Sequence, residues 1–217
     1  DDVYPHFLLD PIILSCPGQT TELLTPLFDD QHYVYLGYLM ANDQDVTAFA
    51  QAYAQEIAAG GDFSGNLPAP TSYGNTLRRL RRGVENWLIE DINDPFGSAN
   101  IAAQVPVMFD WPDNHQHRFG GNVLFLDGHV DFVEYPGKFP MTEHAMETLA
   151  ALANYTPPSG WRGNESTHPY TAEGDPHGFV RNCANNLKQA QLIQRMFSHG
   201  NPGDFYPRMS AEAGRLM

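Results

Sequence analysis

The sequence predicts an α+β fold, and two observations carry this prediction. Two β-like runs flank Asp127-Gly128, a dipeptide that accepts the positive φ angles of a tight β-hairpin. Several longer segments carry non-polar residues at helical spacing, and turn residues separate them. The chain has 217 residues, of which 42% are hydrophobic, so it is long enough for one ordinary domain with a sizeable core.

The first half of the chain is predicted to hold one strand and two helices. Tyr33–Met40 is rich enough in aromatic and β-branched residues for a strand. Asp45 can cap a helix over 46–59, which Gly60-Gly61 ends. A second helix is predicted over 75–90, where non-polar side chains recur every three or four residues: Leu77, Leu80, Val84 and Leu88.

Four arginines lie on the outer face of that second predicted helix: Arg78, Arg79, Arg81 and Arg82. One interpretation is a patch that binds phosphate or a polyanion. The other is a solvated helix face that pairs with acidic groups of the same protein, and the strongly negative net charge favours it.

The second half is predicted to hold a short strand, a hairpin and two further helices. The strand is Val105–Phe109, and the hairpin joins Asn122–Leu126 to His129–Val133. One helix is expected over 142–153. The last is expected over 183–199, with Asn182 as its cap and Gly200 at its end.

Composition excludes some classes of function. Asp and Glu number 26 against 12 Lys and Arg, so the net charge is −14. A nucleic-acid-binding protein needs the opposite balance, so we expect no nucleic-acid partner. No apolar run approaches 18 residues, so we expect no membrane span in this chain.

Two separate segments resemble one protein family. His117 is followed after nine residues by Asp127-Gly128, within the longer string 117–132. Pro106–Asp110, Tyr135–Pro140, Cys16-Pro17 and Tyr33–Tyr38 match the surroundings of that motif. Together they resemble the bacterial prepilin-type proteins named for their His-x9-Asp-Gly motif, which are similar to pilins and pseudopilins.

The segments stand in circularly permuted order. Cys183–Gln189 and Phe205–Pro207 resemble the beginning of the family, yet they come last here. Residues 1–150 and 179–217 would together form one domain of this kind, and 151–178 would be a linker or an inter-subunit excursion. The chain is then one period of a tandem-repeat protein, a subunit whose last helix completes its neighbour, or a permutant that closes on itself.

The resemblance implies a pilin-like body: a long helix packed on an antiparallel sheet with a central Asp-Gly hairpin. It implies a bacterial protein exported to the cell surface or the extracellular space. In the familiar order Cys16 and Cys183 would be 50 residues apart, and a disulfide between them would suit an exported fibre protein. The alternative is two buried free thiols.

A metal site is one hypothesis for the histidines and carboxylates near the motif: His115, His117, His129, Asp127 and Asp131. Ca²⁺ is the possible cofactor that pilin relatives suggest, and a transition metal is a further alternative. The third alternative is structural. In it, His117 forms a hydrogen bond with the Asp127 turn or a backbone carbonyl and fixes the hairpin, and no cofactor is needed.

The remaining candidates are surface features. Asn154 and Asn164 begin glycosylation-type triplets. Trp161, Tyr155 and Tyr170 lie in the Pro- and Gly-rich excursion and could anchor an interface, whereas Trp87 and Trp111 are expected in the core. No nucleophile or metalloprotease motif is present, so we expect no enzymatic activity.

These observations predict a structural protein. It would be a subunit, or one repeat, of an extracellular filament or surface assembly that joins to itself head to tail. The alternatives are a minor pseudopilin-like component of a secretion system and a secreted module that binds metal or glycan.

Overall fold

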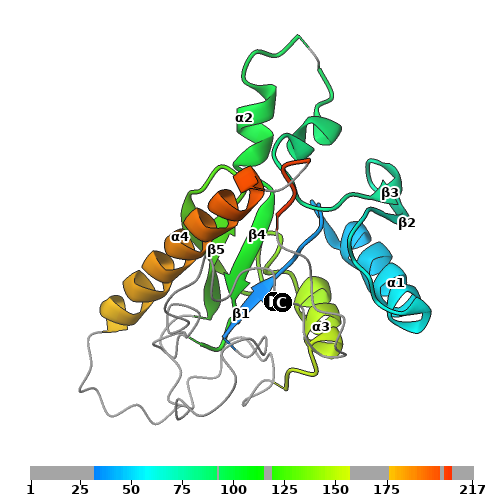
Figure 1. Cartoon of the computed structure of the whole chain (residues 1–217). Coiled ribbons are helices and arrows are strands. Elements are labelled where there is room, and N and C mark those ends of the chain that lie inside the picture. Colours follow the sequence, from blue (N-terminus) through cyan, green and yellow to red (C-terminus); the bar gives the residue numbers. More distant parts are fainter. Residues whose placement is uncertain (1–31, 92, 115–118, 157–175, 201–202, 207–217) are drawn as a thin grey trace.

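A computed structural model describes residues 32–91, 93–114, 119–156, 176–200 and 203–206 (Figure 1). These residues form an α+β fold, as predicted, with helices and antiparallel sheets. The larger sheet in the described part has four strands in the order β1-β4-β5-β6. Their bounds are Tyr33–Tyr35, Pro106–Asp110, Gly120–Phe125 and Val130–Glu134.

The two central strands are buried at every residue, so the sheet is covered on both faces. Helix α4 (Pro176–Gly200) lies along β5 on one face (Figure 1). On β5, a Cβ at Gly121 would overlap the Asp110 backbone and would lie 2.6 Å from the Met141 side chain. Gly121 therefore lets neighbouring elements approach the sheet closely.

Helix α1 (Asp43–Ala59) begins one turn earlier than Asp45 would have placed it. Asn42 is the cap, and its side chain accepts a hydrogen bond from the Asp45 backbone N at 3.2 Å. The Asp45 carboxylate is fully buried and instead accepts from Ala41 N and Ser72 N, at 2.9 and 2.7 Å. The prediction of Asp45 as cap is therefore wrong, because this carboxylate ties α1 to the adjacent hairpin.

That hairpin consists of β2 (Leu67–Thr71) and β3 (Gly74–Leu77), which pair antiparallel and pack against α1. The predicted helix over 75–90 is wrong. After β3 the chain stays extended and forms isolated bridges through Arg79 and Arg81, and only Val84–Leu88 turns into a short 3₁₀ helix, η2. Gly83, with φ of 77°, interrupts any helix here. Leu77 and Leu80 are buried positions of extended chain, and Val84 and Leu88 belong to the short 3₁₀ helix, so their spacing does not reflect one α-helix.

The Asp-Gly turn joins β5 to β6, which pair antiparallel. The Phe125 N–H donates to His129 O at 3.0 Å, and the Gly128 N–H donates to Phe125 O at 2.9 Å. Gly128 has φ of 102°, but Asp127 is not among the residues with positive φ. The connection is thus a three-residue loop that needs one glycine, rather than a two-residue turn with positive φ at both positions.

Helices α3 and α4 differ in how well the sequence predicted them. Helix α3 (Glu143–Leu152) matches the expected range and is capped by Thr142. Helix α4 begins at Pro176, several residues before the expected start, so Asn182 lies inside the helix and is not its cap. Proline fits the first turn of a helix, where its missing N–H costs no hydrogen bond. A short helix, α2 (Gly97–Ala102), was not predicted.

Candidate functional site

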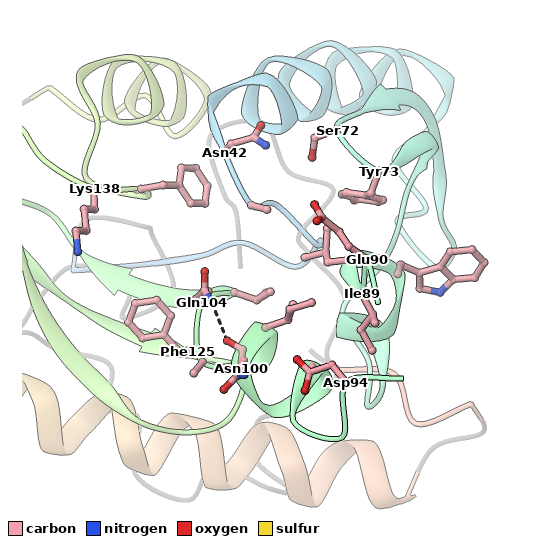
Figure 2. Close-up of a pocket in the computed structure, with 18 of the residues that line it drawn as sticks. Asn42, Ser72, Tyr73, Ile89, Glu90, Asp94, Asn100, Gln104, Phe125 and Lys138 are labelled. Carbon is pink, nitrogen blue, oxygen red and sulfur yellow. Dashed lines mark hydrogen bonds between the residues drawn. The ribbon is translucent and has the colours of Figure 1, made fainter. Parts of the chain in front are cut away.

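A hollow of about 1140 Å³ opens beside the larger sheet (Figure 2). Its walls come from the start of α1, the β2–β3 hairpin, the segment from η2 through α2, and the edge formed by β5 and β6. Figure 2 shows Ser72 and Tyr73 near α1, with Asp94 and Asn100 on the facing wall. Lys138 lies at the end away from Tyr73. A hollow of this size could accept part of a peptide, a helix or a sugar chain.

One wall of the hollow is acidic. Glu90, Asp91 and Asp94 are exposed, and none of them forms an ion pair with any described basic side chain. Asp91 Oδ1 accepts from Asn93 N and Asp94 Oδ1 accepts from Phe96 N, each at 2.9 Å. These bonds shape the loop and leave both carboxylates exposed, so this wall favours a cationic group.

Two large aromatic side chains are exposed on the same segment. Trp87 is 48% exposed and Phe96 is 67% exposed. The Arg78 guanidinium lies 3.1 Å from the Trp87 ring centroid, which is a close cation–π contact. The prediction that Trp87 belongs to the core is therefore wrong, because its chain segment is a turn on the rim and not a helix packed on the sheet. Trp111 is fully buried, as predicted.

Tyr73 has a structural role on the opposite wall. Its hydroxyl donates to Leu39 O at 2.6 Å, and burial raises the pKa of this hydroxyl far above its usual value of about 10. Tyr73 therefore supports this wall as a neutral, hydrogen-bonded side chain.

The motif residues within the described part form contacts that hold the turn. Asp127 Oδ1 lies 2.7 Å from His129 Nδ1 and accepts from His129 N at 3.0 Å. The His129 ring also stacks on Phe125, with centroids 4.5 Å apart. Asp131 Oδ1 accepts from Phe132 N at 2.9 Å. His115 and His117 lie outside the described residues.

Within the part of the chain that the structure describes, no three His, Cys, Asp or Glu side chains gather as a metal site would require. The metal hypothesis therefore has support only from the contact between His129 and Asp127. Ca²⁺ and a transition metal both stay hypotheses, and so does the expectation of no cofactor.

The Asp-Gly turn rests against α4. Gly128 faces the Gln191 side chain so closely that a Cβ at this position would overlap the amide group. Arg195 Nη2 donates to the Asp127 carbonyl oxygen at 2.7 Å. The turn that carries the sequence motif thus positions the long helix on the sheet, a role that the sequence alone did not reveal.

Helix α4 has one buried side and one exposed side. Cys183, Leu187 and Ala190 are buried against the sheet, whereas Leu192 is 60% exposed and Met196 is 51% exposed. Leu192 and Met196 are four residues apart, so they are neighbours on the outer surface of the helix. The exposed residues Lys188 and Arg195 accompany them, and α4 contains no acidic residue.

The four arginines of the sequence analysis point to different partners. Arg79 is 7% exposed and donates to Ser64 O at 2.9 Å and to Tyr206 O. Arg81 lies 5.6 Å from the Phe205 ring, and Arg82 contacts His199. They do not share one helix face, because this segment is not a helix. The helix assumed in both interpretations of the arginine patch is therefore wrong, whereas phosphate binding by single arginines stays a hypothesis. Extended backbone sends successive side chains in opposite directions.

Of the other predicted site residues, two are buried, one is exposed and four lie outside the described part of the chain. Tyr155 is 7% exposed, stacks on Trp111 at 4.3 Å and donates to Asp113 at 2.8 Å, so it belongs to the core and not to an interface. Cys183 is buried on α4, and Asn154 is exposed just after α3 with φ of 50°. Four residues lie outside the described part: Cys16, Asn164, Trp161 and Tyr170.

Comparison with known proteins gives no relative: no protein-family model matches the chain, and neither do curated proteins or solved structures. None of the described helices is long and non-polar enough to cross a membrane. The function must therefore be argued from the surfaces themselves, and the hollow and the outer side of α4 are the two that the fold makes prominent.

Proposed function

We propose that the chain is a structural subunit, or one repeat, of an extracellular assembly joined head to tail. The observation that carries this proposal is the exposed side of α4, defined by Lys188, Leu192, Arg195 and Met196. We call it the α4 outer face. It offers adjacent non-polar side chains and positive charge in a protein whose net charge is −14.

The α4 outer face is unusual within this molecule. Single exposed non-polar residues are common on protein surfaces and need no explanation. Here two of the four large hydrophobic side chains that are exposed in the described part lie one helical turn apart on a helix without acidic residues. Such a stripe is typical of a helix that packs against a partner.

The acceptor surface would be the acidic wall of the hollow on a second copy. It combines Glu90, Asp91 and Asp94 with the exposed ring of Trp87. Phe96 is exposed on the same segment beside this wall. Opposite charges would align the two surfaces, and the non-polar side chains would supply the buried area. The two surfaces belong to different elements, so each copy keeps one free donor and one free acceptor. A contact of this kind extends into a filament where its rotation does not close a ring.

The resemblance to prepilin-type proteins supports the same function. A pilin-like subunit has a long helix on an antiparallel sheet, and α4 on β4–β6 has that arrangement in its coarse form. The proposed location, outside a bacterial cell, rests on this resemblance. An assembly role needs no turnover, so the expectation that the chain is not an enzyme stays part of the proposal.

A charge-exchange experiment tests the proposal. Lys188→Glu reverses a charge on the α4 outer face, and Glu90→Lys reverses one on the acidic wall. We expect each variant alone to sediment as a smaller species than the unmodified chain at equal concentration. An equimolar mixture of the two should recover large species, because every junction in it can then pair opposite charges.

The matched control is Glu147→Lys, which makes the same charge change on the exposed part of α3, away from both surfaces. We expect it to sediment as the unmodified chain does. Loss of assembly in the control, or a mixture that stays small, would contradict the proposed contact. An unmodified chain that remains a single species at every concentration would contradict assembly itself.

A secreted glycan-binding module is the second candidate, and the exposed Trp87 beside a hollow of about 1140 Å³ favours it. Exposed aromatic rings provide stacking surfaces for sugar rings. Titration with soluble oligosaccharides should then change Trp87 fluorescence, and Trp87→Ala should abolish the change. Assembly by the α4 outer face predicts no such response.

A further inference from the structure

A second, smaller hollow lies where α4 meets the chain that precedes η2. Its volume is about 370 Å³. Arg82 comes from the segment before η2, Arg195 and His199 come from the end of α4, and Tyr206 comes from the last described segment. The Asp-Gly turn closes one side through Asp127. The hollow is separate from the acidic wall and from the α4 outer face, apart from sharing Arg195.

The cationic side chains of this hollow are held in place by neutral partners. Arg82 Nη1 lies 3.2 Å from His199 Nε2, and Arg195 Nη2 donates to the Asp127 carbonyl oxygen at 2.7 Å. His199 Nδ1 lies 2.7 Å from Arg195 O. A carbonyl oxygen only accepts, so Nδ1 carries a proton, and in the neutral ring Nε2 accepts from Arg82.

The two guanidinium groups have no direct ion-pair partner in the described part of the chain. No described carboxylate pairs with Arg82 or Arg195, although the protein has 26 acidic residues. Two acidic residues line the hollow, and each contacts a residue other than these arginines. The Glu85 carboxylate accepts from Ser98 Oγ at 2.9 Å, and the Asp127 carboxylate contacts His129 at 2.7 Å.

We propose that this hollow binds a small oxyanion of the phosphate or sulfate class between Arg82 and Arg195. Each guanidinium has five N–H donors in a planar fork, of which the contacts above use only a few. Forks of this type match the oxygens of phosphate and sulfate with two parallel hydrogen bonds. The buried Tyr206, which is 3% exposed, gives the hollow a rigid floor. A bound anion would bridge α4 to the body of the protein.

The test is a titration of the whole chain with sulfate and, separately, with inorganic phosphate at constant ionic strength, followed by calorimetry. We expect saturable binding of one anion per chain. Arg82→Gln should weaken it by about tenfold or more, because a hydrogen bond to a charged group is lost. Arg195→Gln should do the same, which keeps the test valid if either variant folds poorly.

The matched control is Lys138→Gln, which removes one positive charge from an exposed position after β6, outside this hollow. It should leave the dissociation constant within about twofold, as expected for a screened charge at a distance. Equal weakening by Lys138→Gln, or heat that does not saturate, would overturn the site. Acetate is a further test anion. If acetate bound as tightly as sulfate, the assignment of the ligand to the phosphate or sulfate class would be wrong. These results do not depend on self-assembly, which sedimentation measures separately.

Discussion

Helices α1 and α4 both pack one side against the core, but their exposed sides differ in composition. Each buries one side in the common core, through Val46, Phe49 and Tyr53 in α1 and through Cys183 and Leu187 in α4. The exposed side of α1 carries small and polar residues such as Thr47, Ala54 and Gln55, and its first turn is acidic. The exposed side of α4 instead carries Leu192 and Met196 without any acidic residue.

This difference distinguishes side chains that stabilise the fold from side chains that are available to a partner. A helix that only completes a core needs one non-polar side, and polar residues elsewhere keep it soluble. Helix α1 meets this description fully. A second non-polar stripe adds nothing to the core, so on α4 it is available to the partner that we propose.

The largest effect is expected on the buried side of α4. Leu187→Ala should lower the free energy of unfolding by about 2–5 kcal/mol, because it leaves a cavity against the sheet. Leu192→Ala, five residues away on the outer face, should change it by less than about 0.5 kcal/mol. Denaturant unfolding of both variants measures the contrast. Equal losses of unfolding free energy in the two variants would show that α4 does not have one buried and one exposed side.

The next effect concerns the turn on which α4 rests. Gly128→Ala should destabilise the fold by about 1–3 kcal/mol, because φ of 102° is unfavourable for alanine and the new Cβ overlaps Gln191. Gly65→Ala is the control, since nothing lies within 4 Å of a Cβ there. Thermal unfolding should separate the two variants by several degrees. A Gly128→Ala protein as stable as its control would rule out a positioning role for this turn.

A smaller effect is expected near α1 at alkaline pH. Tyr38 contacts Phe49 at 6.0 Å and donates to Gly65 O at 3.0 Å, and burial raises the pKa of its hydroxyl well above 10. The folded state therefore keeps this proton at a pH where the unfolded chain releases it, so stability is complete below pH 10 and falls as the pH rises further.

Tyr38→Phe should flatten that alkaline decline, and denaturant unfolding at several pH values between about 9 and 11 measures it. Tyr73 and Tyr206, whose pKa values burial also raises, would account for the decline that remains. If the free energy of unfolding of the variant fell with pH as steeply as that of the unmodified chain, the Tyr38 hydroxyl would not contribute to the alkaline decline.

The smallest effect is expected at the exposed end of α4. Arg195→Gln removes the hydrogen bond to the Asp127 carbonyl, which is at the surface, and should cost at most about 1 kcal/mol. Hydrogen exchange of the last turn of α4 should report it as faster exchange with little change elsewhere. Global unfolding of this variant would show that the contact holds the whole helix on the sheet.

The sequence predicted the elements whose signals are local. Alternating residues beside Asp127-Gly128 indicated β5 and β6. The Ala- and Gln-rich run that ends at Gly60-Gly61 indicated α1, and the segment after Pro140 indicated α3. It failed at 75–90, where non-polar residues at helical spacing belong to extended chain and Gly83 breaks the helix. The start of α4 was missed because residues before Asn182 show no regular non-polar pattern.

The surfaces were harder to predict than the elements. Trp87 was assigned to the core through the incorrect helix, and Tyr155 was assigned to an interface through its Pro-rich surroundings, yet the structure reverses both. The hollow brings the acidic wall of Glu90, Asp91 and Asp94 next to distant parts of the chain, so only the fold reveals it. A clue was present in α4, whose lack of acidic residues is visible in the sequence.

The most direct test of head-to-tail assembly is negative-stain electron microscopy of native protein, before any refolding. A chain of this length folds into a body about 4 nm across. The proposed contact predicts uniform filaments or rows with an axial repeat close to that size, and their loss in the Lys188→Glu variant. Dispersed single particles of the unmodified chain, at concentrations where the variant looks the same, would contradict it.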